Sequence, residues 1–275
     1  MITVNLFDDT FRQDLCSVAG KKPRAVRYVR DRMTWDGVTL FVDGYVRNGV
    51  ASQVQSRYKI GWLHEPRCLH PENYEAEPVG DFDQILTYSA PLLDRPGYRF
   101  APYGGVWLPR SEWGLRPKTK LVSLLVGDKT ATAGHRMRRA VADALEPMGM
   151  VDFYGSRGTP TTYGWQTKRQ VLAGYAFSII VEACREDNLF TEILLDALAV
   201  GTVPIFWGAP NIGEFFDARG ILSFETVEEA VALVRSLDMR QSQAMQPYRA
   251  ANLQAISEYE VTEDWLYRHV LRRFA

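Results

Sequence analysis

The second half of the chain alternates nearly continuous apolar runs with segments of helical periodicity. The runs at 121–127, 177–183 and 203–208 have the length of a strand, and the segments between them carry apolar residues every three or four positions. Strands that are apolar on both faces are typical of a parallel sheet covered by helices on both sides. This half of the chain is therefore predicted to form a Rossmann-like α/β domain.

The first half has a similar but less regular pattern. A segment with two prolines and four basic residues, 107–120, joins the two halves. We expect two Rossmann-like domains facing each other across a cleft, one over 1–112 and one over 113–275 that includes the terminal helices. A single doubly wound domain with an elaborated N-terminus is the alternative. The strand candidates of the first half are ITVNLF, VTLFVDG, YKIGWL, FDQILTY and YRFAPYG.

Composition excludes several classes of protein. Of the 275 residues, 46% are apolar and 24% are charged, which excludes disordered and fibrous chains. The net charge of −1 creates no overall field toward nucleic acid or an anionic membrane. The three cysteines are far apart and do not indicate a disulfide scaffold. No apolar window is long enough to span a membrane, and Asp8 and Asp9 come too early for a signal peptide. We expect a cytoplasmic protein with no membrane anchor.

Three glutamates follow or adjoin predicted strands of the α/β pattern. Glu65 follows YKIGWL, Glu182 ends FSIIVE, and Glu192 opens the helical segment FTEILLDAL. Ligands of open α/β sheets bind at the carboxyl ends of the strands, so all three are candidate site residues. Taken alone, Glu192 is better interpreted as an acid favoured by a helix N-terminus, and Glu65 as an ordinary loop acid.

Glycines and arginines near the same predicted edge suit an anionic ligand. Gly155 and Gly158 flank Arg157 in the turn after MVDFYG, and Arg138 follows the run at 121–127. A solvated basic helix face explains Arg138 equally well. The chain has neither a GxGxxG fingerprint nor a GxxxxGK[ST] loop. Its four histidines lack metal-ligand spacing, so no metal site is predicted.

The stretch YAFSIIVEACREDNLFTEILLDALAVGTVPIFWGAPNIGEFF (175–216) resembles the donor-binding signature of glycosyltransferase family 10, the α-1,3/1,4-fucosyltransferases. TE, DAL, GTVPI and WGAPNI occur in the order typical of that family. The helix with Arg138 and the pair Tyr154-Gly155 match the strand–Arg–helix–YG order upstream. KIGWLHEP, FDQILTYS and APYGGVWLP are similar to the shorter bacterial and viral branch of the family.

This resemblance implies a GT-B architecture and inverting, metal-independent transfer of a sugar from a nucleotide diphosphate. The first domain then binds the acceptor and the second binds the donor. By the same resemblance Glu65 is the general base, Arg138 holds the donor diphosphate, Glu192 contacts the ribose and Glu182 lies near the donor sugar. These roles agree with the chemistry, which needs a base for the acceptor and positive charge at the leaving group.

Two positions depart from the family pattern. Ile193 replaces a phosphate-binding lysine, and Ala183 replaces an asparagine. Lys129 or Arg157 could supply the missing positive charge.

The donor predicted first is GDP-fucose and the acceptor is a glycan, in a bacterium or a virus-infected cell. A viral enzyme that uses another nucleotide sugar, such as a UDP-sugar, on modified DNA bases is one alternative. Its motivation is the segment Lys21–Arg32, which holds six basic residues and one acid. A non-catalytic member that binds a nucleotide or glycan is the other, motivated by Ile193 and Ala183.

Overall fold

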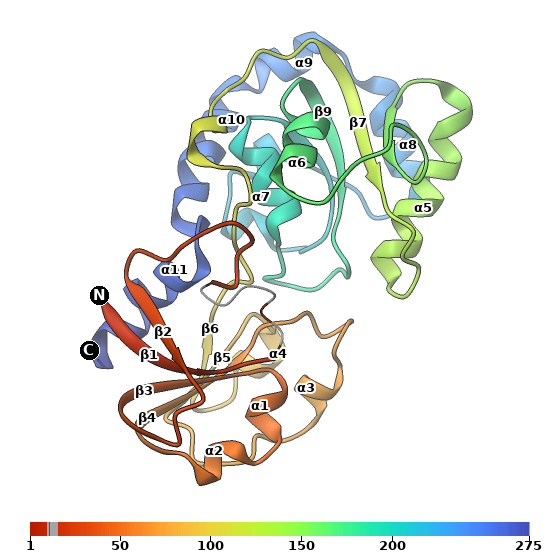
Figure 1. Cartoon of the computed structure of the whole chain (residues 1–275). Helices are drawn as coiled ribbons and strands as arrows, with labels where there is room; N and C mark the ends of the chain where they lie inside the picture. Colours follow the sequence, from red (N-terminus) through yellow and green to blue (C-terminus); the bar gives the residue numbers. More distant parts are fainter. Residues whose placement is uncertain (10, 12–15, 275) are drawn as a thin grey trace. The chain divides into compact units, whose positions relative to one another are not determined.

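The computed structural model describes residues 1–9, 11 and 16–274, which divide into two compact units (Figure 1). The first unit comprises Met1–Gly105, Asp187–Leu189 and Glu260–Ala275, and the second comprises Val106–Glu186 and Phe190–Tyr259. The C-terminal segment therefore groups with the first unit, whereas the predicted span 113–275 had assigned it to the second.

The first unit is built on a six-stranded parallel sheet in the order β2-β1-β3-β4-β5-β6. The sequence pattern predicted five of these strands. It missed β2, whose sequence VRYVR carries two arginines, as an edge strand often does. The strands are β1 Ile2–Phe7, β2 Val26–Arg30, β3 Thr34–Val42, β4 Gln55–Leu63, β5 Gln84–Thr87 and β6 Tyr98–Phe100.

The helices of this unit are short, except for the C-terminal one. Helix α11 is fixed to the unit by its own side chains, which explains why it groups there. The buried carboxylate of Glu263 accepts hydrogen bonds from the Ser17 amide and the Cys16 thiol, and Trp265 packs edge-on against Phe100. The helices are α1 Gly44–Arg47, α2 Val50–Gln53, α3 Glu72–Glu75, α4 Ala90–Leu93, α11 Thr262–His269 and the 3-10 helix η6 Leu271–Phe274.

The second unit has a five-stranded parallel sheet in the order β11-β10-β9-β7-β8. Its central strand β9 is buried at every position, as the continuous apolar run predicted. The strands are β7 Lys120–Val126, β8 Asp152–Gly155, β9 Tyr175–Val181, β10 Val203–Trp207 and β11 Leu222–Ser223.

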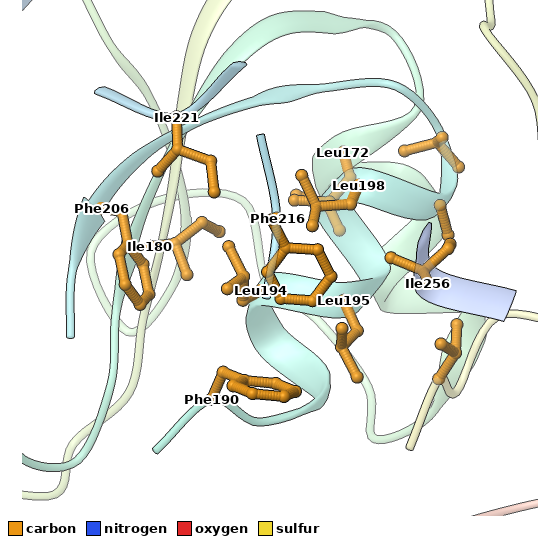
Figure 2. Packing of buried hydrophobic residues seen from close by; sticks show 14 of the residues in the cluster. Leu172, Ile180, Phe190, Leu194, Leu195, Leu198, Phe206, Phe216, Ile221 and Ile256 are labelled. Atoms are coloured by element: carbon orange, nitrogen blue, oxygen red, sulfur yellow. The ribbon is translucent and has the colours of Figure 1, made fainter. Parts of the chain in front are cut away.

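Helices cover both faces of this second sheet, and a separate apolar cluster fills each side. Helices α5 and α8 pack on one face. On the other, α6 and α7 enclose a cluster that includes Phe190, Leu194, Leu198, Phe206 and Phe216 (Figure 2). The helices are α5 Ala133–Leu145, α6 Trp165–Leu172, α7 Glu192–Ala199, α8 Val227–Ser236, α9 Met239–Ala244, α10 Gln246–Ala255 and the 3-10 helices η1 Arg110–Glu112, η2 Glu146–Met148, η3 Ile212–Glu214, η4 Ala218–Gly220 and η5 Ile256–Tyr259.

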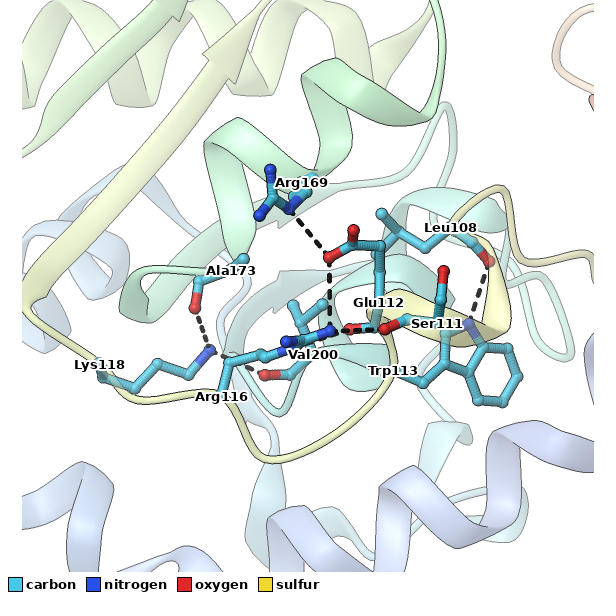
Figure 3. Close-up of polar contacts among 9 residues, drawn as sticks. All are labelled: Leu108, Ser111, Glu112, Trp113, Arg116, Lys118, Arg169, Ala173 and Val200. Carbon is cyan, nitrogen blue, oxygen red and sulfur yellow. Dashed lines mark hydrogen bonds and ion pairs between the residues drawn. The ribbon is translucent and has the colours of Figure 1, made fainter.

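The segment predicted to join the domains is fixed to the second unit by polar contacts (Figure 3). Arg169 Nε donates to Glu112 Oε2 at 2.9 Å. Lys118 Nζ donates to the carbonyls of Ala173 and Val200 at 3.0 and 2.8 Å. These bonds occupy carbonyls at the ends of α6 and α7, so the connection is part of the folded unit.

The prediction of parallel α/β sheets is confirmed in both units. Both sheets are wound in the same way, because the chain moves from the first strand to one side and then returns to the other. Among the described residues, no helix has the length and apolar character needed to cross a membrane.

Candidate active site

The second unit contains a cavity of about 550 Å³ at the carboxyl ends of β7, β8 and β9. Strands β7 and β9 are neighbours, but the chain leaves β7 toward β8 on one side and continues from β9 toward β10 on the other. This is the topological switch point, where open α/β sheets bind their ligands. The walls include Gly127, Arg138, Gly155, Ser156, Lys168 and Ile193.

Arg138 reaches this cavity from the second turn of α5. The helix begins at a capping box in which the Thr132 side chain accepts from the His135 amide. A Cβ atom on Gly134 would lie 1.7 Å from the carbonyl oxygen of Glu182, so only glycine lets α5 approach β9 this closely. The close packing of α5 on β9 places Arg138 at the wall of the cavity.

The guanidinium of Arg138 is largely removed from water. Its Nε is buried and has no hydrogen-bond partner among the described residues. Burial lowers the pKa of Arg138, and the neighbouring Glu182 raises it. A buried cationic donor without a partner is costly, and a bound anion would satisfy it.

Gly155, the last residue of β8, forms another wall. Its φ is +79°, and a Cβ atom there would lie 2.2 Å from the Val126 carbonyl oxygen. The Ser156 amide donates to that same oxygen at 3.0 Å. The end of β8 therefore lies directly against the end of β7, and glycine is required at position 155.

Lys168, which the sequence analysis did not select, also lines the cavity. It lies on α6, and its side chain is 9% exposed. Its Nζ is 3.4 Å from Glu192 Oε1 and 3.8 Å from Asp196 Oδ2. Ile193 lines the same cavity. A positive charge is thus present beside the position where the family has a lysine, but it comes from a different helix.

Glu192 is the first residue of α7 and is paired with Lys168. The carboxylate of Asp196, one turn later, accepts the amides of Trp107 and Leu108, both at 3.0 Å. Burial raises the pKa of Asp196 to about 7, an increase that Lys168 opposes. The first two turns of α7 therefore hold two acids, one paired with the cavity-lining Lys168 and one that anchors the connecting segment.

Glu182 is 1% exposed and is bonded to the start of α7. Its Oε1 accepts the Thr191 amide at 2.9 Å, and its Oε2 is 2.8 Å from the Thr191 hydroxyl. Burial raises the pKa of Glu182 to about 8, so the carboxyl is mostly protonated at neutral pH. The side chain connects the end of β9 to α7, and its predicted place near the donor sugar stays a prediction.

Of the predicted donor-site residues only Arg138 and Gly155 line the cavity, and Glu182, Glu192 and three others do not. The Tyr154 side chain is buried in the core, with its hydroxyl 2.8 Å from that of Tyr175. Arg157 forms ion pairs with Asp143 and Glu146. Lys129 is exposed. The sequence spacing located the turn after β8 correctly, but it could not tell which side chains there point toward the core.

Glu65 belongs to the first unit, directly after β4. Its amide donates to Asp43 Oδ1 at 3.2 Å, and its carbonyl accepts the Tyr74 hydroxyl at 2.6 Å. It therefore lies at the carboxyl end of a parallel strand, as predicted. Among the described residues, no group of three His, Cys, Asp or Glu side chains is arranged to hold a metal ion.

The comparison that decides the family covers the whole cavity. The model of the C-terminal part of glycosyltransferase family 10 (fucosyltransferase) matches residues 115–262, more than half of the chain. The chain belongs to glycosyltransferase family 10. Every residue that lines the cavity lies within this match, and Glu65 lies outside it.

Two relatives with fucosyltransferase names each match about a third of the chain. An α-(1,3)-fucosyltransferase FucT of Helicobacter pylori is 28% identical over 104 residues, which are 37% of this chain and 22% of that protein. A fucosyltransferase-like protein of Arabidopsis thaliana is 32% identical over 101 residues, 36% of this chain and 17% of that protein. The chain thus matches only about a fifth of the length of these relatives.

Solved structures resemble this family 10 chain over most of its length. A crystal structure of an α1,3-fucosyltransferase has a TM-score of 0.55 at 14% identity and covers 99% of this chain and 90% of its own. The structure of an α1,3-fucosyltransferase with GDP has a TM-score of 0.53 at 14% identity, with coverages of 90% and 81%. The likeness confirms the predicted GT-B fold with two Rossmann-like domains.

Proposed function

We propose that this chain transfers a sugar from a nucleotide diphosphate to an acceptor hydroxyl, with GDP-fucose as the first donor to test and a glycan as the acceptor. The observation that carries the proposal is the buried, unpartnered Nε of Arg138 in a cavity at the switch point of the family 10 unit. A diphosphate is an anion of the kind that such a donor binds.

The departing diphosphate gains negative charge as its bond to the sugar breaks. In this proposal Arg138 stabilises that charge, because a fixed cation in a site that excludes water is more effective than one in solvent. The proposal therefore requires no metal ion for the diphosphate.

Lys168 supplies the second positive charge in this proposal, in place of the lysine that Ile193 replaces. Its distances to Glu192 and Asp196, 3.4 and 3.8 Å, are longer than the 2.7–2.9 Å typical of charge-assisted hydrogen bonds. The ammonium is thus held in the cavity without being tightly bonded. Glu192 remains the candidate for the ribose hydroxyls.

Glu65 acts as the general base in the proposed inverting reaction. Its carboxylate takes the proton of the acceptor hydroxyl while the acceptor oxygen bonds to the anomeric carbon. The bond between that carbon and the diphosphate oxygen breaks in the same step, and the electron pair leaves with the diphosphate. Attack on the face opposite the leaving group inverts the anomeric centre.

The alternative acceptor, modified DNA bases, has less support from the local contacts. Lys21 and Arg24 in the basic segment both pair with Glu260, and Arg30 pairs with Asp8. These cations already have acidic partners, which reduces their attraction for phosphates. A cytoplasmic location and a bacterial or viral source stay predictions.

Donor binding is tested by thermal unfolding with GDP, GDP-fucose, UDP and ADP, each with and without EDTA. A ligand at 100 times its dissociation constant adds about 2.7 kcal/mol, which raises Tm by several degrees. A shift with GDP that EDTA leaves unchanged supports the proposal. A preference for UDP replaces the donor, and no shift with any nucleotide favours the non-catalytic alternative.

The proposed contact between Lys168 and the diphosphate is tested by comparing the affinities for GDP and guanosine. Loss of a phosphate contact in Lys168→Met weakens GDP and leaves guanosine unchanged, whereas a role limited to orienting Glu192 weakens both equally. Lys129→Met, which removes an exposed lysine at the same end of the sheet, is the matched control. Equal weakening of the two ligands contradicts the phosphate contact.

A further inference from the structure

The loop that carries Glu65 is held by side chains from three other segments. Residues 64–67 follow β4, where the sheet hydrogen bonds have ended. Nevertheless their peptide groups are bonded to Asp43, which follows β3, to Tyr74 on α3, and to Tyr88, which follows β5. Backbone in a loop is usually bonded to water or to its own turn, so this degree of fixation needs an explanation.

Asp43 holds the amide side of the loop. It is 1% exposed, and its Oδ1 accepts the amides of His64 at 2.8 Å and Glu65 at 3.2 Å. Its own amide donates to the Trp62 carbonyl at 2.9 Å. The residue adopts φ +48° and ψ −109°, outside the left-handed helical region, a conformation that costs free energy in any residue except glycine.

Tyr74 holds the carbonyl side. Its hydroxyl donates to the Glu65 carbonyl at 2.6 Å. Tyr88 is 1% exposed, and its hydroxyl accepts the Arg67 amide at 2.8 Å. Both peptide groups of Glu65 are therefore fixed, its amide by Asp43 and its carbonyl by Tyr74.

The residue before Glu65 is fixed by packing. The His64 ring is stacked on Tyr103 and lies edge-on to Trp62, with ring centres 4.5 Å apart in both pairs. Burial lowers the pKa of His64 to about 3, so the ring stays neutral. An inward side chain at 64 that is held on two sides leaves little freedom for the backbone of the next residue.

We propose that Asp43 and Tyr74 are positioning residues that aim the Glu65 carboxylate at the acceptor hydroxyl. This inference rests on the proposed function, in which Glu65 is the base. Proton transfer requires the carboxylate and the hydroxyl within hydrogen-bond reach, and a displacement of about 1 Å can reduce the rate about a hundredfold. Bonds to both peptide groups that flank the Glu65 Cα resist such a displacement better than packing of the long Glu65 side chain alone.

Tyr74→Phe tests the inference with little risk to folding, because it removes one oxygen from a half-buried ring. Tyr45→Phe is the matched control, since Tyr45 and Tyr74 pack on the same apolar cluster. The assay measures GDP release from GDP-fucose with N-acetyllactosamine or with water as acceptor. A separate thermal-shift titration gives the GDP affinity. The variant Glu65→Gln is measured in the same assays.

We expect Tyr74→Phe to lower kcat about tenfold while the donor KM, the GDP affinity and Tm stay close to wild type. Asp43→Asn keeps the shape of the side chain, removes the charge that accepts the two amides, and is expected to lower kcat in the same way. Tyr45→Phe is expected to change none of these quantities.

The outcomes separate the inference from the proposed function. Unchanged kcat in Tyr74→Phe, together with an inactive Glu65→Gln, overturns the positioning role and keeps Glu65 as the base. An active Glu65→Gln, or a wild type that releases no GDP with either acceptor, overturns the proposed function and this inference with it. A fall in Tm at unchanged kcat shows that the two bonds serve stability alone.

Discussion

Replacing Arg138 by methionine separates the effect of this residue on the stability of the unliganded protein from its effect on GDP binding. The Nε of Arg138 is buried without a partner among the described residues. A polar group left in that condition costs about 1–3 kcal/mol. Methionine has a similar length and no charge, so the unliganded variant should be at least as stable as the wild type. A gain of 1–3 kcal/mol corresponds to an increase in Tm of a few degrees.

This expectation requires that removal of the arginine leaves no buried, negatively charged carboxylate without a partner. Glu182 interacts with Arg138, but burial raises the pKa of Glu182 to about 8. Its carboxyl is therefore mostly neutral at pH 7 and keeps its bonds to Thr191. In the proposed function, the same substitution also removes a charge contact with the diphosphate. Such a contact contributes about 2–4 kcal/mol, so GDP should bind about 30- to 1,000-fold more weakly.

Differential scanning fluorimetry gives Tm, and isothermal titration calorimetry gives the dissociation constant of GDP. Arg139→Met, one position further along α5 and outside the cavity wall, is the control and should leave GDP binding unchanged. A dissociation constant for Arg138→Met within about threefold of wild type would refute the assignment of Arg138. A Tm several degrees lower would refute the idea that its charge is unsatisfied.

Three further predictions follow from the second unit. Gly155→Ala puts a Cβ atom 2.2 Å from a carbonyl oxygen, so it should lower Tm by several degrees and weaken GDP binding. Gly149 also has positive φ but has open space around it, so Gly149→Ala should lower Tm by less. Burial raises the pKa of Glu182 from 4.5 to about 8, so the folded state binds this proton more tightly than the unfolded state. The free energy of unfolding should therefore fall by at most about 5 kcal/mol as pH rises from 4.5 through 8. Chemical denaturation at a series of pH values measures this dependence, and Glu182→Gln should flatten it. If the charge of Lys168 replaces that of a lysine at 193, a lysine restored at 193 should compensate for the loss of Lys168. In calorimetry the double variant Lys168→Met/Ile193→Lys should then bind GDP more tightly than Lys168→Met alone. Equal affinities would contradict the replacement.

The second unit could be predicted well from the sequence because its signals are local. Strand β9 reads as a continuous apolar run, and it is buried at every position. Thr226 directly precedes the helical run of α8, and its side chain caps that helix by accepting the Glu229 amide at 3.2 Å. The turn after β8 was located from its glycines. Such features depend on a few neighbouring residues, so they survive any tertiary arrangement.

Side-chain direction was the part that the sequence did not determine. Tyr154 and Gly155 are adjacent, yet the tyrosine lies in the core and the glycine lines the cavity. Lys168 was missed because its only local signal is a basic residue in a short helix after a glycine-containing turn. Which face of α6 meets the cavity depends on how the helix packs on β7 and β9, and that information is spread over distant residues.

The two departures from the family pattern have unequal consequences in this fold. At position 183 the backbone, not the side chain, makes the contact. The Ala183 carbonyl accepts the Gly134 amide at 3.0 Å and so joins the end of β9 to the start of α5. Any side chain that fits there preserves this junction and, with it, the place of Arg138. At position 193 no backbone group can replace a charge. In the proposed function, the ammonium of Lys168 at the same cavity is therefore the group that replaces this charge.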